Sequence, residues 1–79
     1  MQNKINIETI IKVRRTQLKL SQQDLAEFAE VGIATVKDIE RGKGNPSLQT
    51  LEKILNVLGL EMSFGIKKTE YLNDNMNKE

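Results

Sequence analysis

Three charged side chains close together in this sequence, Lys37, Asp38 and Arg41, are the groups best suited to chemistry with nucleic acid. A lysine can donate to guanine, a carboxylate can accept from the amine of cytosine, and an arginine can hold a phosphate. If the segment is a helix, Val36 and Ile39 point inward at about 100° per residue. The outward face, which could reach base edges, then consists of Ile33, Ala34, Lys37, Asp38 and Arg41.

The sequence offers few residues for other kinds of chemistry. The 79 residues include no cysteine and no histidine, so disulfides, thiol nucleophiles, thiolate metal sites and imidazole bases are all excluded. The acidic residues form no convergent set at a plausible pocket. We therefore expect a protein that is not an enzyme and that has no metal site and no cofactor.

The charge distribution is more informative than the net charge, which is only +1. Non-specific affinity for nucleic acid comes largely from Lys and Arg, and residues 1–20 hold five of them against the single acid Glu8. No apolar run approaches the roughly 20 residues that span a bilayer, and the N-terminus lacks a secretory signal. We expect a cytoplasmic protein without membrane contact. The basic residues are Lys4, Lys12, Arg14, Arg15 and Lys19.

Two short helices must position the charged face. Ser21 and Asp24 have capping-box spacing, and Leu20 and Leu25 have the spacing of a hydrophobic staple, which predicts a helix over residues 22–29. A second helix is predicted over residues 33–41, with Gly42 as its left-handed C-terminal cap. Two helices of this size joined by a tight turn match a helix-turn-helix, in which the second helix enters the major groove of DNA.

Two further helices are predicted on either side of this unit. One covers residues 7–18, with Asn6 available as its N-cap. The other begins at the cap Ser47, after the turn-forming Gly44, Asn45 and Pro46, and stops before Gly59. The core-facing residues are predicted to be Ile7, Ile10, Ile11 and Leu18 in the first of these helices and Leu48, Leu51, Ile54, Leu55 and Leu58 in the second.

After Gly59 the hydrophobic period changes. Met62, Phe64 and Ile66 alternate with less apolar residues, which predicts a short strand. A lone strand is not stable in water, so we expect the same strand of a second copy to pair with it across a dimer interface. The domain is predicted to cover residues 1–66 and to be followed by a flexible polar tail, residues 67–79. Within that tail Tyr71 and Leu72 are either a partner-binding hook or a frayed end.

Three sequence stretches, RTQLKLSQQDLA at 15–26, TVKDIERGK at 35–43 and NPSLQTL at 45–51, carry a family resemblance. Together they resemble the Cro/cI, or XRE, helix-turn-helix repressors over residues 7–59. The resemblance implies an all-α, five-helix, lambda-repressor-like domain. One departure concerns the turn between the motif helices, where the family usually has glycine at the position of Glu30. Here the glycine comes two residues later, at Gly32.

The resemblance also implies roles for individual residues. Gln22 matches a glutamine that contacts the DNA backbone, and Arg15 and Glu40 match an internal ion pair. Ile33 and Ala34 match the base-reading positions, and the loop after the second motif helix matches a phosphate-contacting loop. The implied DNA-binding set is Gln22, Ile33, Ala34, Thr35, Lys37, Asp38, Arg41, Lys43 and Asn45.

The stretch LEMSFGI at 60–66 is similar to the HipB-like antitoxins, which dimerise partly through such a strand. Those proteins repress their own operon and bind a HipA-type kinase toxin. The resemblance implies three partners: palindromic double-stranded operator DNA, a second copy of the chain through Met62, Phe64 and Ile66, and a HipA-type kinase toxin. Two alternatives stay open, a protein-interaction module with weak DNA binding and a stand-alone phage-type repressor.

Overall fold

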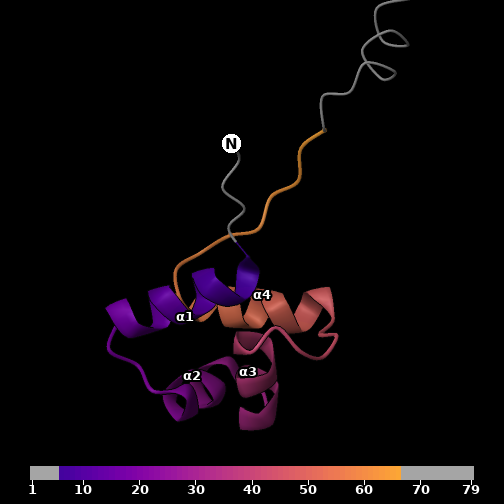
Figure 1. Cartoon of the computed structure of the whole chain (residues 1–79). Coiled ribbons are helices and arrows are strands. Elements are labelled where there is room, and N and C mark those ends of the chain that lie inside the picture. The colour runs from indigo at the N-terminus through magenta and orange to yellow at the C-terminus, as the bar shows by residue number, and fades with distance from the viewer. Residues whose placement is uncertain (1–5, 67–79) are drawn as a thin grey trace, which may run out of the picture.

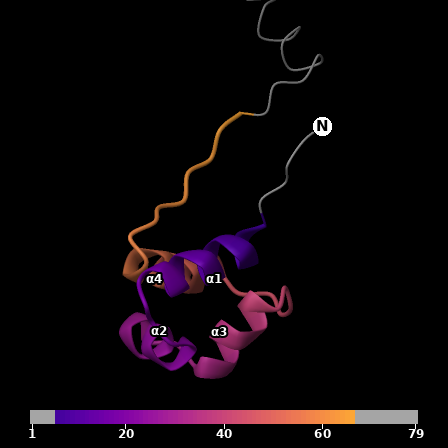
Figure 2. The ribbon, with the colours of Figure 1, turned by 60° about the vertical axis from the view of Figure 1, so that its left-hand side comes forward.

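The structure is a computed structural model and describes residues 6–66. It contains four helices in this range: α1 (Ile7–Gln17), α2 (Gln22–Ala29), α3 (Ile33–Glu40) and α4 (Leu48–Val57). In both views α2 and α3 lie on one side of the domain and α1 and α4 on the other (Figures 1 and 2). The all-helical class is therefore confirmed, whereas a fifth helix is not found among residues 6–66. The predicted tail, residues 67–79, lies outside the described residues.

The predicted helix boundaries agree closely with the observed ones. The bounds of α2 coincide with the prediction, and α1 and α3 each end one residue earlier, because Leu18 and Arg41 are their C-caps. The capping box is present: Asp24 N–H donates to Ser21 Oγ at 2.9 Å, and Ser21 N–H donates to Asp24 Oδ2 at 3.0 Å. Asn6 occupies the N-cap position of α1, but its side chain makes no capping hydrogen bond.

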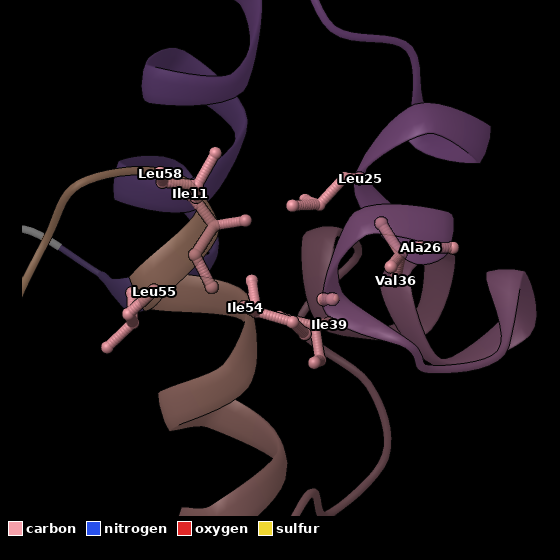
Figure 3. Packing of buried hydrophobic residues seen from close by; sticks show 9 residues of the cluster. Ile11, Leu25, Ala26, Val36, Ile39, Ile54, Leu55 and Leu58 are labelled. Carbon is pink, nitrogen blue, oxygen red and sulfur yellow. The ribbon is translucent and has the colours of Figure 1, made fainter.

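Nine buried apolar residues drawn from all four helices form the core (Figure 3). Burial of apolar side chains from every helix stabilises the domain and fixes how the helices sit against each other. Of the stripe predicted on α4, Ile54, Leu55 and the C-cap Leu58 are buried, whereas Leu48 remains 59% exposed. The core consists of Ile11, Leu25, Ala26, Ala29, Val36, Ile39, Ile54, Leu55 and Leu58.

The predicted core face of α1 is wrong for three of its four residues. Ile11 is fully buried, but Ile7, Ile10 and Leu18 are between 37% and 39% exposed. The reason is that α1 buries only a narrow stripe, Ile11 and Arg15, which lie one turn apart on the same face. Periodicity showed that α1 has an apolar side but not how much of that side the other helices cover.

The turn between α2 and α3 adopts a left-handed conformation at Glu30, with φ 59° and ψ 45°. Glycine tolerates this region freely, whereas a residue with a Cβ pays about 1 kcal/mol. Gly32, by contrast, is the N-cap of α3 and has an ordinary φ of −71°. Glu30 therefore occupies the strained position, and the displaced glycine does not relieve it. Gly42 has φ 73°, as expected for the cap after α3.

The segment after α4 carries neither helix nor strand within the described residues. It leaves the domain on the side of α1 and α4, away from α3 (Figures 1 and 2). The predicted strand is thus not formed in a single chain, and its pairing with a second copy stays a prediction.

Candidate nucleic-acid interface

The outer face of α3 presents Ala34, Lys37 and, at its C-cap, Arg41 to solvent. Val36 and Ile39 are buried, as predicted. Ile33 differs from the prediction, because it is half-buried and packs against the core. Residues three apart on a helix lie only about 60° from each other, so Ile33 shares the inward side of Val36. The exposed face is therefore narrower than expected.

Two opposite charges on this face are joined. Arg41 Nη2 lies 2.6 Å from Asp38 Oδ1, and the two side chains are 61% and 44% exposed, respectively. Lys37, one residue before Asp38, makes no ion pair within residues 6–66. The face thus offers one cation that is already paired and one that is not.

The loop after α3 turns back alongside the helix through Gly42 and Gly44, which both have positive φ. The main-chain N–H of Lys43 donates to the carbonyl of Asp38 at 2.7 Å. A shallow hollow of about 190 Å³ lies between helix and loop. Four residues of the implied DNA-binding set meet at this hollow, namely Thr35, Asp38, Lys43 and Asn45.

Gln22, at the first position of α2, points toward α3 rather than freely into solvent. Its Nε2 donates to Glu40 Oε1 at 3.0 Å. The resemblance implied a contact between this residue and the DNA backbone. In this structure its side chain also joins the start of α2 to the end of α3, a contact that the sequence alone did not reveal.

Glu40 accepts hydrogen bonds from a second and stronger partner, Arg15 of α1. Arg15 Nε and Nη2 donate to the two carboxylate oxygens at 2.6 and 3.0 Å, and Arg15 Nη1 donates to the carbonyl of Leu20 at 2.7 Å. The ion pair implied by the resemblance is therefore present and bidentate. With Gln22, this network connects α1, α2 and α3 and holds α3 in place.

The network changes the acidity of Glu40, whose side chain is only 3% exposed. Burial by itself raises the pKa of Glu40. Hydrogen bonds from Arg15 and Gln22, together with the positive charges of Arg15 and Lys12, outweigh burial and hold the pKa below its ordinary value. The pKa of Arg15 is raised, chiefly by its hydrogen bond to Glu40. Both groups are therefore charged at neutral pH.

Arg14 has a role that sequence reasoning missed. The sequence placed Arg14 only among the basic residues of positions 1–20 and gave it no partner. Its Nε donates to the carbonyl of Leu58 at 2.8 Å, one of the carbonyls that a helix C-terminus leaves unpaired. Arg14 therefore fastens the end of α4 to α1. No sequence signal could indicate this contact, because the acceptor is a main-chain atom 44 residues away.

The predicted dimer residues occupy different environments. Met62 is half-buried and packs against the core of its own chain. Phe64 and Ile66 are 81% and 77% exposed. In the part of the chain that the structure describes, no group of acidic side chains could hold a metal ion, and no helix there is long and apolar enough to cross a membrane.

A comparison with known sequences identifies similar proteins. The helix-turn-helix family profile matches residues 4–64. The immunity repressor protein of Bacillus phage phi105 is 45% identical over 53 residues, which cover 67% of this chain and 37% of that repressor. The chain thus spans little more than a third of the length of this relative, and 46% and 66% of two further ones.

Solved structures give the same result. The biofilm regulator SinR, crystallised in complex with DNA, is similar with a TM-score of 0.64 and 39% identity, covering 70% of this chain and 89% of SinR. A chain of the HipA-HipB-O2-O3 complex is similar with a TM-score of 0.70 and 28% identity, covering 86% of this chain and 100% of that one. The chain therefore belongs to the helix-turn-helix family of the Cro/cI, or XRE, type.

Proposed function

We propose that this chain is a transcriptional repressor that binds double-stranded DNA through α3 and the loop after it. The observation that carries the proposal is the joint position of Lys37, Arg41, Lys43 and Asn45 on and beside the exposed face of α3. Arginine and lysine there can neutralise phosphates, and Asn45 can donate to them. The similarity to SinR, solved in complex with DNA, and to a phage repressor supports this proposal.

Sequence-specific reading rests on few groups. Lys37 can donate to guanine, Asp38 can accept from an exocyclic amine, and Ala34 can contact the methyl group of thymine. Gln22 lies at the N-terminus of α2, where free main-chain N–H groups favour a phosphate. With so few base-reading groups, the shape of the duplex contributes to the choice of site.

We also propose that the protein acts as a dimer, assembled on the side away from α3. There, a hollow of about 390 Å³ is lined mainly by apolar residues. A cavity of about 150 Å³ already holds a benzene ring, so the hollow is large enough for a phenylalanine of a second copy. Phe64 follows directly after this lining and is exposed, so each chain offers both a knob and a hole, as a two-fold interface requires. The lining residues are Ile7, Ile10, Leu55, Leu60, Glu61, Met62 and Ser63.

A HipA-type kinase toxin is the protein partner that we propose for this dimer. The proposal is supported by the similarity to one chain of the HipA-HipB-O2-O3 complex. The similarity extends over 100% of that chain. Two alternatives have their own support. The match to a phage immunity repressor favours a stand-alone repressor, and the net charge of only +1 favours an interaction module with weak DNA binding.

The direct test is binding of the purified protein to its own upstream DNA at two salt concentrations, beside a scrambled duplex of equal length. We expect tight binding to the upstream DNA with a steep salt dependence. The double variant K37A/R41A should bind at least about tenfold more weakly and melt at the same temperature, because both side chains are exposed. Unchanged affinity in this variant would contradict the proposal, and weak binding of the unmodified protein to both duplexes would favour the interaction module.

A further inference from the structure

The ion pair between Asp38 and Arg41 puts an acid into the face that is proposed to meet DNA. Asp38 is the only acidic residue among the nine residues of the implied DNA-binding set. Its Oδ1 lies 2.6 Å from Arg41 Nη2, and both side chains are substantially exposed. Because exposed ion pairs contribute little to folding stability, the pair has no evident structural purpose.

Asp38 is also connected to the loop through its main chain. Its carbonyl accepts from the N–H of Arg41 at 3.2 Å and from the N–H of Lys43 at 2.7 Å. Its side chain lines the shallow hollow together with Thr35 and Asn45. Asp38 is therefore paired with Arg41 and lies beside the loop that carries Lys43.

Two effects on DNA binding follow from this position. A negative charge on the binding face is repelled by every phosphate nearby, whatever the base sequence. In addition, Arg41 cannot fully neutralise a phosphate while it is paired with Asp38. Fewer counterions are therefore released on binding. Both effects lower the affinity for any duplex that presents no hydrogen-bond donor to Asp38.

A duplex with an exocyclic amine opposite Asp38 does present such a donor. A carboxylate has about four acceptor sites on two oxygens, and Arg41 occupies Oδ1. The N4 amine of cytosine or the N6 amine of adenine can donate to Oδ2 from the major groove. On such a duplex the desolvated carboxylate is satisfied on both sides.

We propose that Asp38 is a specificity-determining residue that lowers affinity for non-cognate DNA and restrains Arg41 until a cytosine or adenine amine engages it. This inference rests on the proposed DNA-binding function. Its distinctive consequence is that removing the charge of Asp38 strengthens binding to the wrong DNA. Removal of an ordinary base contact, by contrast, weakens binding to the right DNA and leaves the wrong DNA unaffected.

The test compares the full chain with D38N and with E52Q. E52Q removes the same charge from an exposed position of α4, so it controls for net charge. The cognate duplex is obtained by selection from a random library with the unmodified protein, and the non-cognate duplex is a scrambled version of it. Affinities for both are measured at two salt concentrations. The selection is repeated with D38A, because asparagine can itself pair with adenine.

We expect D38N to bind the scrambled duplex about fivefold more tightly or better, with a steeper salt dependence, and to bind the selected duplex no more tightly. The selection repeated with D38A should lose the preference for cytosine or adenine at one position of each half-site, because alanine cannot accept from an exocyclic amine. E52Q should change both affinities by the same small factor. Equal gains of D38N on both duplexes, or no gain on the scrambled one, would overturn the inference while leaving DNA binding intact. If the unmodified protein failed to distinguish the duplexes, the proposed function would fall as well.

Discussion

The side of the domain built from α2 and α3 differs from the side built from α1 and the segment after α4 in how its groups are satisfied. Around α3, the buried polar atoms have partners: Glu40 receives hydrogen bonds from both Arg15 and Gln22. No buried side-chain nitrogen or oxygen lacks a partner within residues 6–66. On the α1 side, Ile7, Ile10 and Val13 remain 37–48% exposed.

This difference teaches how the two sides are used. Buried charge must be paired with correct geometry, so the network of Arg15 and Glu40 fixes the direction in which α3 points from the domain. Apolar side chains that remain exposed have no such directional partner within residues 6–66, and large exposed apolar patches are typical of interaction sites. The buried polar groups of the first side are satisfied within one copy, whereas the exposed apolar residues of the second are covered by another copy under the proposed dimer.

The substitution with the largest expected effect on folding is E40Q, on the side built from α2 and α3. It leaves the buried charge of Arg15 without a counterion, which costs about 3–5 kcal/mol when one partner of a buried pair is removed. Chemical denaturation of E40Q and of the unmodified protein measures this loss. D38N breaks the exposed ion pair of α3 and should cost less than about 1 kcal/mol. Equal effects of the two substitutions would show that burial does not distinguish the pairs.

The second largest effect is expected on dimerisation, at the side built from α1 and the segment after α4. F64S should weaken the proposed dimer by at least about 100-fold, because burying one phenylalanine contributes about 1.5–3 kcal/mol and a two-fold interface loses two such side chains. Sedimentation equilibrium measures the dissociation constant. F28S is the matched control, since Phe28 is also exposed, at 65%, but lies on α2. Dimerisation that is equally sensitive to both substitutions, or to neither, would contradict the assignment of Phe64 to the interface.

Lowering the pH should weaken the buried ion pair between Glu40 and Arg15. Because the pKa of Glu40 is lower in the folded protein than in the unfolded chain, its contribution to stability is fully present above the unfolded pKa of about 4.3 and is lost as pH falls through the folded value. The free energy of unfolding should therefore decline below about pH 4.5, and the decline should be shallower in E40Q. Denaturant titrations at several pH values provide the measurement. An identical pH dependence in both proteins would mean that other carboxylates are responsible.

The smallest effect is expected at the turn between α2 and α3. E30G should stabilise the protein by up to about 1 kcal/mol, because glycine adopts the positive φ of this position without steric cost, partly offset by its greater freedom in the unfolded chain. A thermal melt detects the change as a higher midpoint. G32A, at a position with negative φ, should not raise the midpoint in the same way. A lower melting temperature for E30G would indicate that the Glu30 side chain makes a stabilising interaction in solution.

The helices themselves could be predicted because their signals are local. Ser21 with Asp24, Ser47 before α4 and Gly42 after α3 act within one helical turn, and α2 was predicted with its observed bounds. The boundaries of α1 and α3 were missed by one residue at the C-terminal end, where helices commonly fray. The four helices and the position of α3 among them were therefore accessible from sequence.

The details of the candidate site were less accessible. The spacing of α3 gave the correct inward positions for Val36 and Ile39. Ile33 is half-buried, because it lies only about 60° from Val36 around the helix and packs against the core. The pairing of Asp38 with Arg41 required knowledge of the rotamers that the two side chains adopt. The joining of Gln22 to Glu40 required the packing of α2 against α3.

The sequence by itself determined the all-helical class, the order and limits of the helices and which face of α3 is polar, because capping and hydrophobic periodicity depend on neighbours only a few residues apart. Only the tertiary structure decided that Arg14 fastens α4 to α1, that Glu40 serves two partners and that much of the apolar face of α1 stays uncovered. These features depend on contacts between residues 18 to 44 positions apart. Such contacts are set by how the helices pack as a whole, and no local pattern records them.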